Sequence, residues 1–190
     1  MLKQLKTALI LFGLLTVLTG LIYPAVITAV SQLIFPAQAN GSLITVNGNV
    51  VGSQLIGQQF DDPKYFCGRI SATGDHPYNA SASSGTNYST LNDSLQKQVE
   101  QRIADLRVVD PGNTQPVPVD LVTASGSGLD PNISIAAARY QAARVAHARS
   151  ISVDQIIALI DQHTQGRFLG FIGESRVNVL LLNLAVDGLK

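Results

Sequence analysis

The sequence is poor in charge and in cysteine, and each shortage excludes a class of protein. Only 14% of its 190 residues are charged, against about 25% in an average soluble chain, so part of it is expected to lie outside water. Thirteen basic residues balance thirteen acidic ones without forming a basic stripe, which argues against a nucleic-acid partner. Because Cys67 is the only cysteine, neither an internal disulfide nor a thiolate metal cluster can form within one chain.

The common catalytic and nucleotide-binding motifs are also missing. The sequence contains no Gly-x-Ser-x-Gly, His-Glu-x-x-His or Walker A pattern. His76, His147 and His163 are scattered, which argues against a zinc site. Ser94 and Lys97 form a Ser-x-x-Lys pattern, but the Ser-Asp-Asn and Lys-Thr-Gly patterns of penicillin-recognising enzymes are absent. We therefore expect no catalytic residue, no cofactor-binding residue and no metal ligand in this chain.

A long apolar run lies near the N-terminus. No charged side chain occurs in residues 7–35, and this run, if helical at about 1.5 Å per residue, exceeds the roughly 30 Å core of a bilayer. The apolar region of a secretory signal has only about 7 to 15 residues, so a membrane anchor is favoured. Pro24 is expected to bend or interrupt the helix.

A cleaved leader is the alternative to an anchor, because Ala37-Gln38-Ala39 has the small-x-small pattern that signal peptidases cut after. Cleavage after Ala39 would release a soluble exported protein, which could be a hydrolase that uses Ser94 and Lys97.

The flanking charges predict the orientation of the anchor. Lys3 and Lys6 precede the run and no charge follows it until Asp61. The positive-inside rule then places residues 1–6 in the cytoplasm and residues 36–190 on the outer side of the membrane.

Several residues of the predicted span recur at spacings of three or four and share one helical face. They are Gly13, Thr16, Gly20, Pro24, Ile27 and Ser31. Thr16 and Gly20 form a small-xxx-small pair, which permits close approach of another transmembrane helix. Since Gly and Thr are common in membrane helices generally, a plain anchor accounts for the same pattern.

Residues 36–190 have the pattern of one mixed α+β domain. Asn47-Gly48 between two β-prone segments predicts a hairpin with a type I′ turn. Residues 60–90 are rich in Gly, Ser, Asn and Pro and lack periodicity, which indicates an ordered loop or an extended contact surface.

The remaining segments alternate between helical and extended patterns. They predict a helix marked by Leu91, Leu95, Val99, Ile103 and Leu106, a strand over 117–123, a helix over 134–148 capped by Ser134, a helix from the capping box Ser152/Gln155 to Gly166, and a strand running into a last helix over 177–189. The predicted fold class is α+β, a single N-terminal transmembrane helix followed by one mixed α/β extracytoplasmic domain.

Several blocks of sequence, taken in order, resemble one known family. They are Tyr23-Pro24 in the span, "NGSL" from residue 40, "LIGQ" from 55, "YFCGRISAT" from 65, "YNASASSGTN" from 78, "LVTASGSGLDPNIS" from 121 and "VNVLLLNLAVD" from 177. The chain is similar to the C subunit of the Kdp-type potassium-transporting P-type ATPase of prokaryotes. It departs from the family at Ile70, where proline is usual, and in residues 83–87, where the family reads Ser-Gly-Gly-Ser-Asn.

The resemblance implies a non-catalytic accessory subunit in the prokaryotic plasma membrane. Its implied partners are a channel-like potassium-translocating subunit, a P-type ATP-hydrolysing subunit, a very small membrane peptide and membrane lipid. Potassium, ATP and Mg²⁺ would be handled by those partners, while this subunit supports assembly and raises the ATP affinity of the pump subunit.

ATP is cytoplasmic whereas the predicted domain faces outward, and the sequence lacks a phosphate cradle. We therefore expect the subunit to act by docking, with the helical face of the span against partner helices. The residues expected to contact a partner or to pin the 60–90 loop are Tyr65, Phe66, Arg69, Tyr78, Asn87 and Asp130. A free-standing single-pass binding module is a third possibility.

Overall fold

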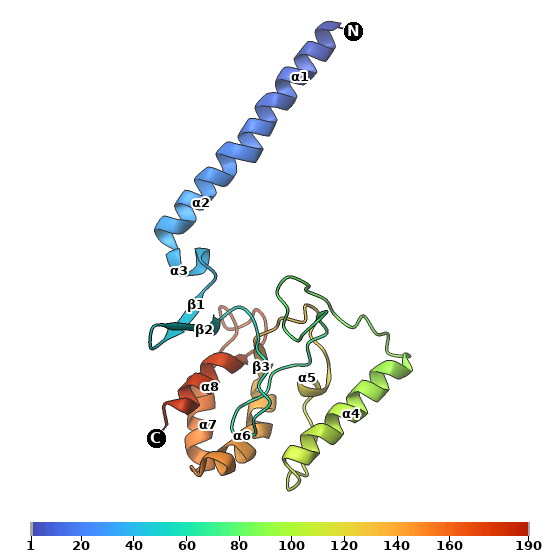
Figure 1. Ribbon diagram of the computed structural model, residues 1–190, viewed down its shortest axis with the longest axis vertical. Helices are drawn as coiled ribbons and strands as arrows, with labels where there is room; N and C mark the ends of the chain where they lie inside the picture. The colour runs from blue at the N-terminus through green and yellow to red at the C-terminus, as the bar shows by residue number, and fades with distance from the viewer. Residues whose placement is uncertain (1, 190) are drawn as a thin grey trace. The chain divides into compact units, whose positions relative to one another are not determined.

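The computed structural model describes residues 2–189, which form two compact units divided between Val50 and Val51. The first unit is dominated by one helix that runs unbroken over Leu2–Ile34, drawn in blue in Figure 1. It comprises α1 (Leu2–Val17), the π-helical segment η1 (Leu18–Ile22) and α2 (Tyr23–Ile34). Within residues 2–189 it is the one helix long and apolar enough to cross a membrane.

The helix widens before Pro24 rather than breaking there. Pro24 has no N–H to donate to the carbonyl of Gly20, four residues earlier. In the preceding turn the N–H of Tyr23 donates to the carbonyl of Leu18, a spacing of five residues that defines a π-turn. Of the two expected effects of Pro24, a bend or an interruption, the interruption is absent, because this wider turn accommodates the proline.

A short helix and a hairpin follow the long helix. Helix α3 (Pro36–Ala39) leads into strands β1 (Leu43–Val46) and β2 (Asn49–Ser53). Asn47 and Gly48 have φ values of 51° and 81°, as a type I′ turn requires, so the predicted hairpin is confirmed.

The second unit combines five helices with a small antiparallel sheet in the described chain (Figure 1). The helices are α4 (Asp93–Val109), α5 (Val119–Val122), α6 (Ile135–Arg149), α7 (Val153–Gln162) and α8 (Val179–Asp187). Strands β3 (Asn132–Ser134) and β4 (Thr164–Gln165) pair on either side of β5 (Arg176–Asn178), with Ile133 and Thr164 both opposite Val177. The expected mixed α/β composition with one N-terminal apolar helix is confirmed.

The core of this unit lies where α6, α7 and α8 meet the sheet. Its largest fully buried apolar side chains are Phe66, Leu121, Ile133, Val145, Ile156, Ile160, Val177, Leu182 and Val186. The buried alanines of α6, among them Ala137, Ala138 and Ala142, let neighbouring elements approach its backbone closely. Phe66 is the member of this core that belongs to the 60–90 loop.

The predicted helix starts are confirmed in atomic detail. The hydroxyl of Ser134 accepts a hydrogen bond of 3.0 Å from the N–H of Ala137 and caps α6. Ser152 and Gln155 form the reciprocal capping box at the start of α7. Both starts depend on residues three apart in sequence, which is why a local pattern reveals them.

Three predictions are wrong, one about the type of an element and two about the ends of helices. Residues 119–122 form α5 and not a strand, because Pro118 supplies the fixed φ suited to a helix start and its carbonyl accepts the N–H of Leu121. Leu91 precedes α4 and is 92% exposed, since Asn92 caps the helix after it. Helix α7 ends at Gln162, ahead of Gly166, where the chain turns into β4.

Candidate functional site

The long irregular loop of the second unit is ordered by contacts with helices distant in sequence. Residues 60–90 contain no helix or strand, and their only bridge in the described chain pairs Ile70 with Ala124. Four polar side chains of α6 and α8 bind the backbone of this loop instead, namely Gln141, Arg144, Arg149 and Asn183. We call these four residues the loop anchors.

Asn183 fixes the centre of the loop inside the core. Its Oδ1 accepts a hydrogen bond of 2.8 Å from the N–H of Phe66, and its Nδ2 donates one of 3.0 Å to the Phe66 carbonyl. Phe66 is fully buried and Asn183 is 1% exposed. One amide therefore satisfies both backbone groups of Phe66 where water cannot reach them.

Gln141 and Arg144 hold the residues on either side of Phe66. The Oε1 of Gln141 accepts the N–H of Cys67 at 2.9 Å, and its Nε2 donates to the Cys67 carbonyl at 3.1 Å. Arg144 donates to the carbonyls of Pro63 and Tyr65 and to the Oε1 of Gln141. Burial lowers the pKa of Arg144, and these acceptors take the place of the water that its charge has lost.

Tyr65 is held between the loop and the end of α8. Its hydroxyl donates to the Oδ2 of Asp187 over 3.2 Å, and the guanidinium of Arg149 lies 4.9 Å from its ring centroid. Arg149 also donates to the Lys64 carbonyl at 2.8 Å and to the Oδ1 of Asp187 at 2.6 Å. These contacts connect the loop to the C-terminal helix through one aromatic ring and one carboxylate.

Tyr78 wedges the second half of the loop against two glycines. Its hydroxyl donates to the Arg69 carbonyl at 2.6 Å, and its N–H donates to the hydroxyl of Ser71 at 2.8 Å. A Cβ added at Gly57 would lie 2.3 Å from the Cε1 of the Tyr78 ring, and one at Gly68 would lie 2.7 Å from its hydroxyl. Burial raises the pKa of Tyr78 to about 12, and its φ of 59° is rare for a bulky residue.

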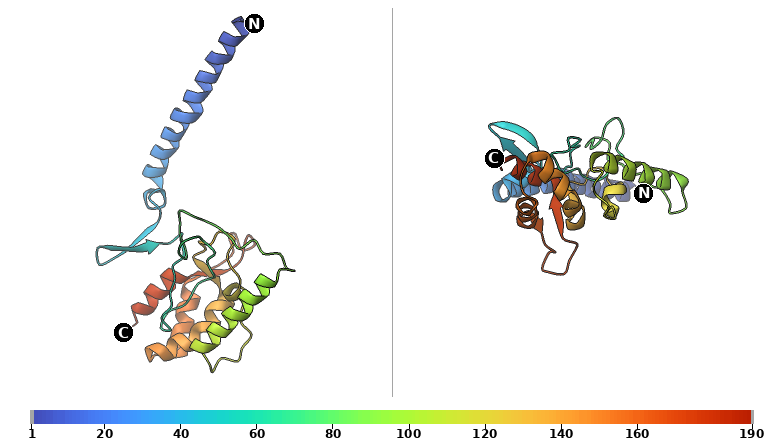
Figure 2. Two further views of the ribbon diagram at one scale, coloured as in Figure 1. Left: turned by 45° about the vertical axis from the view of Figure 1, so that its right-hand side comes forward. Right: turned by 90° about the horizontal axis from the view of Figure 1, so that it is seen from below.

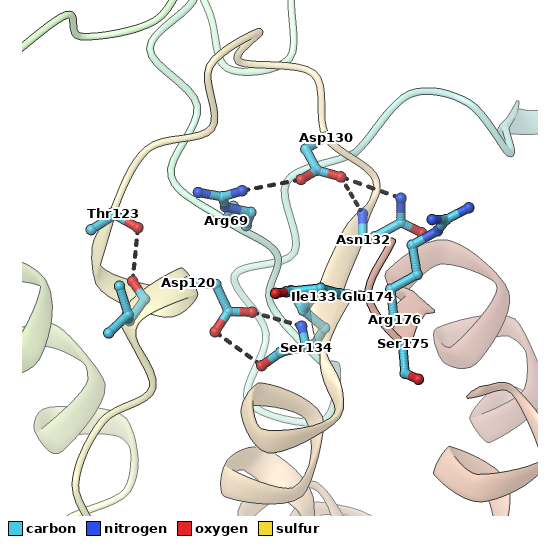
Figure 3. Close-up of a pocket in the computed structure, with 11 residues that line it drawn as sticks. Arg69, Asp120, Thr123, Asp130, Asn132, Ile133, Ser134, Glu174, Ser175 and Arg176 are labelled. Carbon is cyan, nitrogen blue, oxygen red and sulfur yellow. Dashed lines mark hydrogen bonds and ion pairs between the residues drawn. The ribbon is translucent and has the colours of Figure 1, made fainter. Parts of the chain in front are cut away.

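Arg69 and Asp130 form an ion pair at the edge of a cavity of about 530 Å³ (Figure 3). The Nη1 of Arg69 lies 3.2 Å from the Oδ2 of Asp130, and its Nη2 donates to the Ala124 carbonyl at 3.1 Å. The Oδ1 of Asp130 accepts the N–H of Asn132 at 3.0 Å, which orients the carboxylate. The pair thus fastens the loop to the start of β3.

A glycine-rich turn, residues 125–128, packs against the end of the loop. The Ser127 carbonyl accepts the N–H of Ser84 at 3.0 Å. A Cβ on Gly85 would lie 2.8 Å from the Gly126 carbonyl, so the two backbones touch. Asn87 has a φ of 51° and donates to the Gly85 carbonyl at 3.2 Å. The backbone polar groups of this turn therefore serve the fold.

The residues singled out from the sequence fall into separate places. Tyr65 and Phe66 lie on the anchored half of the loop, whereas Tyr78, Arg69 and Asp130 meet at its other half, and Asn87 lies beyond them. Tyr65, Phe66 and the Arg69–Asp130 pair connect the loop to residues distant in the sequence, whereas Tyr78 bonds Arg69 and Ser71, and Asn87 bonds Gly85, all within the loop. That these residues pin the loop stays a prediction. Contact of any of them with a partner stays a prediction.

The loop anchors were missed by sequence analysis although two signals pointed to them. Asn183 interrupts the apolar run "VLLLNLAV". Burying an amide there costs free energy unless the amide forms hydrogen bonds with other buried polar groups. Gln141 and Arg144 likewise lie on the inner side of an alanine-rich helix. Neither signal says which backbone atoms are bound.

The structure also shows the surroundings of the candidate catalytic pair, Ser94 and Lys97, and of the helical face expected to contact other membrane helices. Ser94 and Lys97 are both exposed on α4, and in the described residues no group of three His, Cys, Asp or Glu side chains could hold a metal. On the long helix, Thr16 donates back to the Phe12 carbonyl at 2.8 Å, and nothing lies within 4 Å of a Cβ added at Gly13 or Gly20. Ile27 and Ser31 follow in α2.

A single long apolar helix joined to a loop-rich mixed α/β domain is consistent with a membrane-associated protein. Comparison with known proteins identifies its family. A family model described as KdpC, the c chain of the K⁺-transporting ATPase, matches residues 5–188, and the chain belongs to this family.

Curated relatives agree with the family model. A protein of Methylococcus capsulatus named potassium-transporting ATPase KdpC subunit is 56% identical over 190 residues, which cover all of both chains. One of Herpetosiphon aurantiacus with the same name is 58% identical over 185 residues, or 97% of this chain and 96% of its own. One of Variovorax paradoxus is 58% identical over 183 residues, or 96% and 95%. The chain is a potassium-transport subunit of the Kdp ATPase with one candidate transmembrane helix.

Proposed function

We propose that this chain is a non-catalytic accessory subunit of an ATP-driven potassium uptake complex and acts by docking on its partners. The observation that carries the proposal is the anchored 60–90 loop. A polar segment of this length normally stays mobile unless something orders it. Here the loop anchors and the Arg69–Asp130 pair have already ordered it, so a partner that binds its outer side loses less entropy to immobilise it.

The proposed partners are a channel-like potassium-translocating subunit, a P-type ATP-hydrolysing subunit and a very small membrane peptide. In this proposal these partners bind the potassium, ATP and Mg²⁺, while this chain keeps the partner subunits assembled. The long helix docks through the face of Gly13, Thr16, Gly20, Ile27 and Ser31, where the two glycines and the small Thr16 and Ser31 let another helix approach.

The proposed location of the second unit is the outer side of the plasma membrane, with the N-terminus in the cytoplasm. Lys3 and Lys6 support this orientation through the positive-inside rule. A higher ATP affinity of the pump subunit would then arise from a shift in that partner's conformational equilibrium, without contact between this chain and ATP.

The experiment that tests the proposal is purification of the tagged chain from native membranes in mild detergent. Mass spectrometry would identify its N-terminus and its companions. An intact N-terminus with pump and channel subunits attached is expected. A chain that begins at Asn40 and travels alone would instead favour the cleaved exported protein, and labelling of Ser94 by an acyl-transfer probe would favour a hydrolase.

A pair of variants tests the docking of the helix. Gly20→Leu fills the proposed face, whereas Ala29→Leu adds similar volume about 200° away from Ile27 and Ser31. Recovery of the complex is expected to fall for Gly20→Leu alone. Equal recovery for the two variants would show that the face is not used, as the free-standing module predicts.

Direct nucleotide contact is tested separately. The full chain in detergent, without partners, is exposed to photoreactive labelled ATP at physiological concentration with unlabelled ATP as competitor. Labelling that unlabelled ATP suppresses would refute action by docking alone.

A further inference from the structure

The hairpin between β4 and β5 presents four large apolar side chains to solvent. Phe168, Leu169, Phe171 and Ile172 are 69%, 70%, 71% and 49% exposed. They lie together in five residues, so they form one patch rather than scattered apolar positions. The right-hand view of Figure 2 shows this hairpin projecting beyond the helices of the second unit. We call these four residues the apolar finger.

The backbone of the finger is built to display these side chains. Phe168 and Ile172 exchange two hydrogen bonds of 2.9 Å, each from the N–H of one to the carbonyl of the other. Leu169 and Gly170 follow with φ values of 52° and 84°, so the tip turns through a left-handed conformation that is unfavourable for leucine. Because these hydrogen bonds close the loop, its apolar side chains stay at the tip and do not fold back onto the domain.

The base of the finger is basic. Arg167 follows β4 and Arg176 is the first residue of β5; both are exposed, and Glu174 is the one acidic residue between them. An apolar tip with guanidinium groups at its base matches the interface of a bilayer, where acyl chains lie below a layer of phosphates. The Arg side chain binds phosphate oxygens well because its planar fork can donate two hydrogen bonds.

If the long helix spans a membrane, the second unit cannot lie far from that membrane. The long helix ends at Ile34 and the second unit begins at Val51. The 16 residues between them span at most about 55 Å when fully extended, so an anchored helix keeps the second unit near the bilayer surface. Tethering of this kind raises the effective concentration of lipid around the finger, whichever side of the membrane the unit occupies.

We propose that the apolar finger inserts into the interface of the bilayer that holds the chain's own helix. Phe168, Leu169, Phe171 and Ile172 enter the boundary between head groups and acyl chains, and Arg167 and Arg176 bind lipid phosphates. The second unit then has two attachments to the membrane, the long helix and the finger, which fix its orientation. The inference concerns the bilayer and does not require the docking proposed above.

The absence of tryptophan makes a direct test possible. Because the chain contains none, Phe171→Trp gives a single fluorescent reporter at the finger. Val108→Trp is the matched control, since Val108 is 79% exposed on α4, outside the finger. The full chain carrying either variant is reconstituted into phosphatidylcholine and phosphatidylglycerol vesicles whose acyl chains are brominated.

The tryptophan at position 171 is expected to emit at shorter wavelength in vesicles than in the unfolded chain and to be quenched by the brominated chains. The control at position 108 is expected to keep the emission of water-exposed tryptophan. Arg167→Gln with Arg176→Gln should reduce quenching at position 171 in these vesicles. Phe168→Trp is a second reporter, and circular dichroism confirms that each variant is folded.

Two results would overturn the proposal. Emission from position 171 that stays unquenched and red in vesicles would show that the finger remains in water. A reporter shifted to shorter wavelength by added pump and channel subunits, yet unquenched by brominated lipid, would show that the finger binds protein and not the bilayer.

Discussion

Asn183→Leu is the substitution that tests most directly how the loop is held. Leucine has nearly the shape of asparagine but can neither accept from the N–H of Phe66 nor donate to its carbonyl, which lie 2.8 Å and 3.0 Å from the Asn183 amide. Both Phe66 groups are then left without these partners in a site that excludes water. An unsatisfied buried polar group costs about 1–3 kcal/mol, so the two together cost about 2–6 kcal/mol.

Two smaller effects oppose this loss. Leucine favours a helix over asparagine by about 0.5 kcal/mol and buries more apolar surface than the amide does. We therefore expect the free energy of unfolding of the second unit to fall by about 2–4 kcal/mol. The loss should be concentrated in the loop, because α8 itself keeps its packing.

The assay is urea unfolding of the full chain in mild detergent, with hydrogen exchange of peptides covering residues 60–74. Gln101→Leu is the control, since it removes a single exposed hydrogen bond, of 2.8 Å to Asp105, by the same polar-to-leucine exchange. Exchange in the loop should speed up for Asn183→Leu alone. Equal unfolding free energies for the two variants, with unchanged exchange, would refute the view that this amide holds the loop.

Three further outcomes follow from the same contacts. The Tyr78 pKa is raised to about 12 in the fold against about 10 in the unfolded chain, so the stability that Tyr78 contributes through its proton is complete below pH 10 and is lost as pH rises through 12. The free energy of unfolding should therefore fall by up to about 3 kcal/mol over that pH window, and by less in Tyr78→Phe. Gly57→Ala should lower the unfolding free energy by about 1–3 kcal/mol because its Cβ meets the Tyr78 ring, whereas Gly74→Ala, with open space around it, should not; equal melting temperatures would contradict this. Ser152→Ala should cost about 1 kcal/mol and Ser152→Gly a few tenths, since glycine is tolerated at a helix start; a larger loss for glycine in thermal unfolding would argue against the capping box.

What the sequence could predict was local in origin. The Asn47-Gly48 hairpin and the caps at Ser134 and Ser152 depend on residues within a few positions of each other, and each was found. The strands of the small sheet have two or three residues each, too few for an alternating pattern to show, and β3 and β4 were missed. The β-branched residues near position 119 favour a strand, but the preference of Pro118 for a helix start outweighs them, and α5 forms.

Some residues of the loop could be singled out from the sequence, but the side chains and backbone groups that bind them could not. Tyr65, Arg69 and Tyr78 stood out from the sequence, yet Tyr65 is held by Asp187, 122 residues further along the chain, and Arg69 by Asp130, 61 residues further along. Asn183 meets Phe66 across 117 residues, and no spacing rule reaches that distance. Their pairing depends on how the core packs, which local propensity leaves undetermined.

The separation between the loop and its anchors also sets an order of events during synthesis. The segment around Phe66 is made early, whereas its binding partner Asn183, on α8, is made 117 residues later. Until α8 is available, the N–H and carbonyl of Phe66 lack the Asn183 amide that satisfies them, and the loop cannot close fully on the core. A nascent chain therefore carries an open, protease-sensitive segment until α8 has been made, so truncation just before α8 should leave the loop as the first place to be cut.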